Sequence, residues 1–332
     1  MTTFVIPAHN EGMVIGRLLS QLVPAGSASD LDIIVVANGC TDNTAEVAAS
    51  FGPCVRILSI PVACKHAALV AGDGAAADYP RIYADADIEL RAEDVKELEA
   101  ALRKPGVLAA APALVLDMAG AHWTVRWYYE IWRRLPAVRS GLFGRGVIAI
   151  AEEGHERIAS LPPLLADDLA ASLSFAPHER AIVPSARVVF HTSRTFSDLL
   201  RRRVRAATGV AQIERTEQAP ASTARTRMSD LAAIVRGDLR MAPRVALFLL
   251  VAVIARLRAA RAVARGDYTT WLRDESSRRI AAADPATGSD RLAGSDRLAG
   301  SAAPGGNRLT AGAAGAPAAG GGRGGGRQAG WR

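Results

Sequence analysis

The sequence is poor in the residues on which several classes of protein depend. Its three cysteines, Cys40, Cys54 and Cys64, match no zinc-binding spacing. An odd number of cysteines favours a reducing compartment and argues against a disulfide framework. No apolar run reaches the roughly 20 residues of a membrane-spanning helix, and no signal-like segment precedes the first apolar strand. We therefore expect a cytoplasmic protein.

Lysine and aromatic residues are scarce as well. Lysine occurs only at Lys65, Lys96 and Lys104, and aromatic residues make up 5% of the chain. The formal net charge is nevertheless +7, which favours anionic partners such as nucleotide diphosphates or anionic lipid headgroups. Nucleic acid is disfavoured, because the basic residues are not interleaved with aromatics that could stack on bases and no binding motif is recognisable.

The first ninety residues alternate between strand and helix patterns. The expected strands are 3–7, 32–37, 55–60 and 81–84, and the expected helices are 11–22, 44–50 and 65–77. Strands that alternate with helices form a Rossmann-like, mainly parallel sheet flanked by helices, so the expected fold class is α/β. Polar clusters at 8–11, 38–42 and 85–87 each follow a strand. Because ligands bind outside the carboxyl ends of strands in such sheets, we expect these clusters to form one site.

Beyond residue 91 the pattern is less regular. We expect helices at 93–103, 122–134, 164–175 and 196–208, and strands at 107–116, 147–151 and 181–191. Residues 243–258 hold about ten consecutive apolar residues between arginines, too few to cross a membrane. Two interpretations stay open for this segment, a buried helix and a helix lying in a membrane interface.

Asp85 and Asp87 end an apolar strand in the run Tyr-Ala-Asp-Ala-Asp. Hard divalent cations such as Mg²⁺ and Mn²⁺ prefer oxygen ligands and are often shared with substrate phosphates. Two carboxylates one residue apart can hold such a cation against a diphosphate. The same pair also occurs by chance in solvated turns, so its meaning depends on the rest of the sequence.

Three segments resemble the family 2 glycosyltransferases. They are FVIPAHNEGMVIGRLLSQL, DIIVVANGCTDNTAEVA, and KHAALVAG followed by YPRIYADADIEL, which span residues 3–90 in the family's order. The resemblance implies a GT-A fold, a nucleotide-diphospho-sugar donor, and a Mg²⁺ or Mn²⁺ ion. It also implies a domain at 1–212, with a nucleotide-binding half at 1–90 and an acceptor half at 91–212. A helical extension at 213–280 and a disordered Gly/Ala-rich tail at 281–332 would follow.

The resemblance carries over to individual positions. The residues assigned to the nucleotide-sugar are Pro7, Ala8, His9, Glu11, Asn38, Lys65, Asp85, Arg202 and Arg205. Asn38 stands where the family usually has an aspartate that reads the uracil edge, which leaves the base open because an amide also presents donors. Lys65 is either a ligand of the donor or an exposed lysine at a helix start. Asp87 is the expected metal ligand, with Asp85 facing the metal or the ribose.

Asp167 and Asp168 begin an expected helix in the run Leu-Leu-Ala-Asp-Asp-Leu. In the family, a carboxylate pair at such a helix start provides the base that deprotonates the acceptor hydroxyl. We assign Asp168 as this base and Asp167 as its neighbour. The alternative is that both carboxylates only complement the helix dipole. The glycine-rich segment 141–146 resembles the acceptor-side segment that precedes this pair.

Two further features follow the expected strand at 181–191. Arg202 and Arg205 have the spacing of the family's Q-x-x-R-W element, but Ala206 replaces the tryptophan, which argues against processive synthesis. His191 is a candidate ligand for the metal or a phosphate, although a lone histidine is more often structural.

The sequence therefore predicts an inverting, metal-dependent, non-processive glycosyltransferase. Its acceptor hydroxyl is unidentified; a lipid-linked acceptor or one in cell-surface glycan or glycolipid synthesis fits, with peripheral contact at the inner face of the cell membrane. Two rivals stay open. One is a catalytically inactive, membrane-associated scaffold with the same fold, and the other is a nucleotidyltransferase, which normally has a glycine-rich loop after its first strand.

Overall fold

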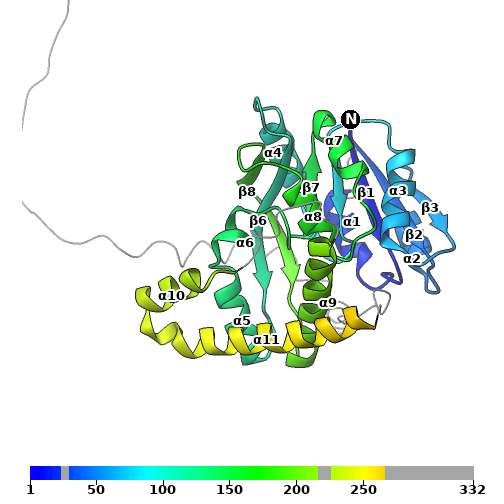
Figure 1. Ribbon diagram of the computed structural model, residues 1–332. Coiled ribbons are helices and arrows are strands. Elements are labelled where there is room, and N and C mark those ends of the chain that lie inside the picture. The colour runs from blue at the N-terminus through cyan, green and yellow to red at the C-terminus, as the bar shows by residue number, and fades with distance from the viewer. Residues whose placement is uncertain (24–29, 216–225, 266–332) are drawn as a thin grey trace, which may run out of the picture. The chain divides into compact units, whose positions relative to one another are not determined.

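The computed structural model describes residues 1–23, 30–215 and 226–265 (Figure 1). The tail expected at 281–332 lies outside the described residues, as do 216–225 and 266–280 of the expected extension.

Eight strands of the described chain form a single mixed sheet in the order β3-β2-β1-β4-β7-β6-β8-β5. Their bounds are β1 (Thr2–Ala8), β2 (Leu31–Asn38), β3 (Val55–Ile60), β4 (Arg81–Ala84), β5 (Ile88–Leu90), β6 (Ala109–Asp117), β7 (Val147–Ile150) and β8 (Arg180–His191). β1 runs parallel to β2 and β4, β2 to β3, and β6 to β8. β7 is antiparallel to β4 and β6, and β5 is antiparallel to β8. The sheet is therefore mainly parallel, as predicted, with two reversed strands.

The helices cover both faces of the sheet and its far end. They are α1 (Ile15–Leu22), α2 (Thr44–Ala49), α3 (Lys65–Ala75), α4 (Ala92–Leu102), α5 (Trp123–Trp132), α6 (Pro136–Ser140), α7 (Glu152–Ala159), α8 (Asp167–Leu173), α9 (Phe196–Arg215), α10 (Met228–Gly237) and α11 (Ala242–Ala264). α1 begins later than the expected start at residue 11, because the intervening residues form a turn in which the Glu11 carbonyl accepts from Val14 and Ile15. The sequence pattern did not indicate β5, α6 or α7, whereas α10 falls within the helical extension expected at 213–280.

Alternate residues of the central strands face opposite sides of the sheet. Phe4 and Ile33 belong to the core that contains residues of α1 and α4. Ile34 and Val36 instead pack with Ala68 of α3 on the other side. Coverage on both faces explains why β2 reads as a continuous apolar run, and it leaves the carboxyl ends of β1, β2 and β4 as the polar edge.

A separate core lies between α5, α9 and α11 (Figure 1, with α11 in yellow). On α11, Phe248 and Val251 are buried, and the Phe248 ring stacks on Tyr128 with centroids 4.9 Å apart. Leu250 and Leu257 lie on another side of the same helix and are more than half exposed. The buried-helix interpretation of 243–258 thus describes one face of α11 only. No helix in the described ranges has the length and hydropathy needed to cross a bilayer.

Gly72 and Gly74 of α3 offer a matched pair for testing how closely this helix must approach the sheet. A Cβ at Gly72 would come within 2.5 Å of Val5 Cγ1 and 3.0 Å of Val36 Cγ2, whereas a Cβ at Gly74 would meet nothing within 4 Å. We expect Gly72→Ala to lower the free energy of unfolding by about 1–3 kcal/mol through overpacking. Gly74→Ala should raise it by up to about 1 kcal/mol, because alanine is the better helix former. Urea unfolding measures both, and equal effects would contradict the close approach.

Candidate active site

The loops after β1 and β2 are tied together at the polar edge of the sheet. The Asn10 side-chain oxygen accepts from the Thr41 amide at 2.7 Å, and the Glu11 amide donates to Thr44 Oγ1 at 2.8 Å. His9 Nδ1 lies 2.6 Å from the Asn38 carbonyl oxygen. The structure therefore brings together two of the three polar clusters expected from the sequence.

Asn38 is buried, with 2% of its surface exposed. Its Nδ2 donates to the Ala8 carbonyl at 2.9 Å and to the Val36 carbonyl at 3.3 Å. Its Oδ1 is buried and has no hydrogen-bond partner within the described part of the chain. The amide donors that distinguish asparagine from aspartate thus hold the ends of β1 and β2 together.

Lys65, at the first position of α3, joins the two halves of the site. Its Nζ lies 2.7 Å from Asp85 Oδ1 and 2.9 Å from Asp167 Oδ2. The side chain is only 25% exposed. Burial by itself would lower the pKa of Lys65, but the charges of Asp167 and Asp85 outweigh it, so the pKa is raised and the ammonium stays charged. Of the two interpretations of Lys65, the geometry favours a site residue.

Asp85 follows the end of β4, where its backbone amide donates to the Gly146 carbonyl at 2.7 Å. Burial would raise the pKa of Asp85, but Lys65, and then Arg205 and Arg202, lower it. Both arginines come from α9, so the fold brings them into electrostatic range of Asp85 from a distant part of the sequence. The Arg202 guanidinium itself lies over the Phe190 ring, 4.1 Å from its centroid.

Asp85 and Asp87 follow β4 and carry carboxylate oxygens, the donors that Mg²⁺ or Mn²⁺ prefers. Among the described residues, no group of three or more His, Cys, Asp and Glu side chains could enclose a metal by itself. A pair of carboxylates fits the other common arrangement, in which substrate phosphates supply further ligands. The donor set is therefore suited to a cation that arrives with a diphosphate.

Asp168 is held differently from its neighbour Asp167. Its Oδ2 accepts from the Gly144 amide and its Oδ1 from the Leu169 amide, both at 2.8 Å. Gly144 has a φ of 72°, a left-handed conformation that glycine adopts without strain. The Asp168 side chain is exposed to solvent on its open side, while neighbouring protein atoms desolvate the carboxylate on the other. This desolvation, and then the charge of Asp167, raise the pKa of Asp168, which is the direction that favours accepting a proton.

Comparison with known proteins identifies one domain. Residues 3–142, less than half of the chain, match the family model described as glycosyl transferase family 2. These residues carry a family 2 glycosyltransferase domain. No curated protein matches the sequence. The family match ends before Asp167 and Asp168, so their roles rest on the geometry and on the resemblance described above.

Solved structures show the fold of this glycosyltransferase. A mannosyltransferase from Pyrobaculum calidifontis, solved with GDP-mannose and Mn²⁺, is 21% identical, with 85% of each chain covered and a TM-score of 0.54. This likeness establishes a GT-A-like fold. Glucosyl-3-phosphoglycerate synthase from Mycobacterium tuberculosis is 19% identical over 66% of this chain and 81% of that chain; its TM-score of 0.48 is too low to add to the assignment.

His191 of the glycosyltransferase lies in a buried charged network. Its Nδ1 is 2.8 Å from Asp117 Oδ2 and its Nε2 is 2.7 Å from Glu89 Oε1, and 7% of the residue is exposed. Arg194 also donates to Asp117, at 2.8 Å. Both ring nitrogens are engaged in this arrangement, so neither is available to a metal, and we leave His191 out of the proposed metal site. Nothing in the sequence signalled this network, because its members come from three distant strands and a loop.

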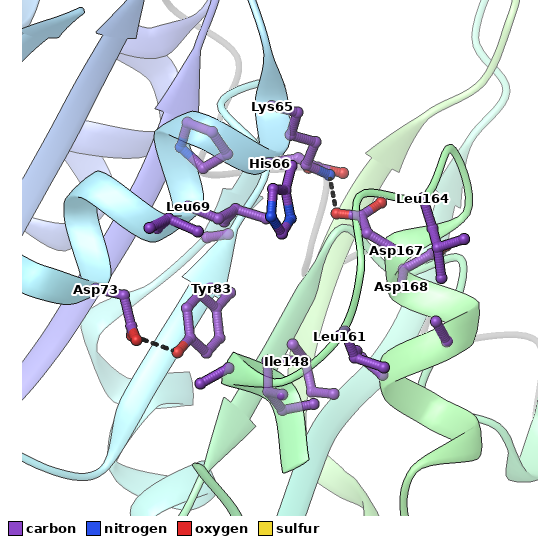
Figure 2. Close-up of a pocket in the computed structure, with 18 of the residues that line it drawn as sticks. Lys65, His66, Leu69, Asp73, Tyr83, Ile148, Leu161, Leu164, Asp167 and Asp168 are labelled. Atoms are coloured by element: carbon purple, nitrogen blue, oxygen red, sulfur yellow. Dashed lines mark hydrogen bonds and ion pairs between the residues drawn. The ribbon is translucent and has the colours of Figure 1, made fainter. Parts of the chain in front are cut away.

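A cavity of about 210 Å³ opens beside Lys65, Asp85, Asp167 and Asp168. Figure 2 shows the Lys65–Asp167 ion pair reaching across one end of it, from α3 to the start of α8, with Ile148 and Leu161 farther in. Most of its lining is aliphatic. No sequence pattern predicted this cavity, because unfilled space depends on how α3, α7 and α8 pack on the sheet.

The His191 network has a testable pH dependence. Burial alone would lower the pKa of His191, but the hydrogen bonds to Asp117 and Glu89 raise it above its ordinary value of 6.5. The charged imidazole therefore stabilises the fold fully below about pH 6.5, and this contribution is lost as the pH rises through the raised pKa. We expect the difference in unfolding free energy between wild type and His191→Asn to shrink over that range, by up to about 1.4 kcal/mol per unit of pKa shift. Urea unfolding at a series of pH values measures it.

The exposed His178 provides the control. His178→Asn makes the same substitution at an exposed position and so corrects for the loss of a histidine as such. A constant difference for His191→Asn across the same range would contradict a charged, network-bound imidazole.

Proposed function

We propose that this domain transfers a glycosyl group from a nucleotide-diphosphate donor to an acceptor hydroxyl, with inversion at the anomeric carbon. The observation that carries the proposal is the position of Lys65 between Asp85 and Asp167. It brings Asp85 and the carboxylate pair of α8 to one cavity, so that a donor and an acceptor can meet there. An inactive scaffold would not need these contacts. Their presence therefore supports a transferase over the scaffold alternative.

The donor is proposed to lie across the ends of β1, β2 and β4. The loop containing Pro7, Ala8, His9 and Glu11 would contact the nucleoside. Lys65, Arg202 and Arg205 supply positive charge toward Asp85, where the diphosphate would lie. The mannosyltransferase of similar fold was solved with GDP-mannose, which supports a nucleotide-sugar donor. The identity of the base stays open, because the amide donors of Asn38 are already engaged with the backbone.

The proposed metal ligands are Asp87 and Asp85, completed by diphosphate oxygens. A bound Mg²⁺ or Mn²⁺ offsets the negative charge that develops on the departing diphosphate. The mannosyltransferase of similar fold was solved with Mn²⁺, which supports such an ion. Lys65 adds a fixed positive charge at the same place, since the ion pairs with both halves of the site keep its ammonium charged.

Asp168 is proposed to remove the acceptor proton. The acceptor oxygen then attacks the anomeric carbon from the face opposite the diphosphate, a new carbon–oxygen bond forms, and the diphosphate leaves with the electrons of the broken bond. The Gly144 and Leu169 amides hold the carboxylate in position. Asp167 is the positioning partner, since its charge raises the pKa of Asp168 while Lys65 holds it in place. Ala206, where processive relatives carry tryptophan, supports a single transfer per encounter.

Two substitutions separate the proposed roles of the carboxylates. Asp168→Asn should lower kcat by about 10²–10⁴-fold, the usual contribution of a general base, while leaving donor and Mn²⁺ affinity near the wild-type values. Asp87→Asn should instead weaken Mn²⁺-dependent donor binding.

Steady-state kinetics and calorimetry with a panel of nucleotide sugars measure both effects, and Glu153→Gln on the exposed start of α7 is the control. Normal turnover by Asp168→Asn would remove it as the base, and a wild type that binds no nucleotide sugar would favour the scaffold.

We also propose that α11 contacts an anionic membrane surface. Leu250, Val253 and Leu257 are exposed by 53%, 51% and 57% and are spaced three and four residues apart, so they form one stripe. Exposed arginines such as Arg258 and Arg261 flank it, and α11 contains no acidic residue. An apolar stripe beside basic side chains suits an interface of acyl chains and anionic headgroups. A second copy would bring arginines near arginines, which disfavours pairing of α11 with itself.

Vesicle binding tests the α11 stripe. Leu250→Gln combined with Leu257→Gln should weaken binding to phosphatidylglycerol-containing vesicles by at least about tenfold, because each leucine loses roughly 1.5–3 kcal/mol of burial. The control is Val62→Gln with Met13→Gln, which replaces exposed apolar residues far from α11 in the sequence. Co-sedimentation measures binding, and equal binding to neutral and anionic vesicles would contradict the proposed role of the arginines.

A further inference from the structure

The cavity beside the carboxylates is polar at one end and apolar along its depth. Lys65 and Asp167 span the polar end, and Ile148 and Leu161 lie deeper (Figure 2). The apolar lining comes from five different parts of the fold: Leu69 of α3, Ile148 of β7, Ile158 of α7, Leu161 and Leu164 of the connection to α8, and Ala171 of α8. A group bound there would be enclosed mainly by aliphatic side chains, with the imidazole of His66 beside the polar end (Figure 2).

The polar groups on the deeper wall are already paired. The Tyr83 hydroxyl donates to Asp73 Oδ1 at 2.6 Å, and Arg81 donates to the same oxygen at 2.5 Å. His155 Nε2 lies 2.7 Å from Asp73 Oδ2. Within the described chain, none of the buried side-chain atoms that lack a partner belongs to a residue lining this cavity. A sugar pushed into this depth would leave its hydroxyl groups unpaired, which is costly; an apolar group would not.

The size of the cavity limits what fits. A cavity of about 150 Å³ lined by aliphatic and aromatic side chains is known to hold benzene in an unrelated protein. At about 210 Å³, this one has room for a single aromatic ring with a short substituent, or for a short alkyl chain. It is too small to enclose the body of a long lipid chain or an oligosaccharide.

We propose that the acceptor is a small apolar alcohol or phenol, with its aryl or short alkyl group in this cavity and its hydroxyl at Asp168. The inference rests on the proposed function for the transfer step. In that step the acceptor oxygen gives its proton to Asp168 and bonds to the anomeric carbon. The bond from that carbon to the diphosphate breaks, and the diphosphate leaves with the electron pair.

Ala171→Leu tests the occupancy of the cavity, since the larger side chain would fill space beside the buried wall without altering a carboxylate. Binding of benzyl alcohol and hexan-1-ol to the full chain is measured by ligand-observed NMR. Transfer to both alcohols and to glucose is measured with Mn²⁺ and a nucleotide-sugar panel, and donor hydrolysis is followed without acceptor. Ala100→Leu, on an exposed position of α4, is the matched control.

The wild type is expected to bind and use both alcohols in preference to glucose. Ala171→Leu should raise their KM at least tenfold, with the KM of the donor in hydrolysis unchanged. Leu161→Ala, which enlarges the cavity, should lower the KM of a bulkier alcohol such as 2-naphthylmethanol, and it keeps the test decisive if Ala171→Leu does not fold.

Three results would overturn the inference: no binding of either alcohol by the wild type, a preference for glucose, or a raised donor KM in Ala171→Leu, which would make the cavity the pocket for the donor sugar. Alcohol binding that Ala171→Leu abolishes, together with no hydrolysis of any nucleotide sugar, would support the apolar site while removing the proposed transferase function. The failure of one proposal is therefore distinguishable from the failure of the other.

Discussion

The arrangement of the whole site depends on one shared cation. Lys65 is bonded to Asp85, which follows β4, and to Asp167, which begins α8. Without it, the carboxylates at 85, 167 and 168 would repel one another in a partly desolvated space. With it, Asp85 and Asp167 share one ammonium, while Asp168 keeps an elevated pKa. One lysine thus offsets the charges of two carboxylates that lie beside a third, whose pKa stays raised.

Other parts of the fold serve to place this lysine and its partners. α3 lies close against β1 and β2 because Gly72 has no side chain to separate them. This close packing also brings Lys65, the first residue of α3, close to the sheet. β7 pairs with β4, and the backbone just before it bonds to Asp85. α9 adds Arg202 and Arg205 to the electrostatic surroundings of Asp85. Residues from distant parts of the sequence therefore surround one small cluster of charged side chains.

The sequence allowed the α/β class and most elements of the sheet to be predicted, because β1, β2 and β4 have apolar runs followed by polar clusters. β5 and α7 were not predicted. The three residues of β5, Ile88–Leu90, are too few to show a strand period. The pairing of Lys65 with Asp167 could not be read from spacing, because it depends on how two halves of a sheet meet. The environments of Asn38 and His191 could not be predicted either, because a linear pattern does not show that both residues are buried.

The reversed strand β7 has a mechanical consequence. It is hydrogen-bonded to β4 on one side and to β6 on the other, so the strands before Asp85 and those that follow α4 belong to one backbone ladder. Hinge motion between these two groups of strands would have to break sheet hydrogen bonds, which is costly. A ligand would then be accommodated by side chains above the sheet rather than by separation of its strands.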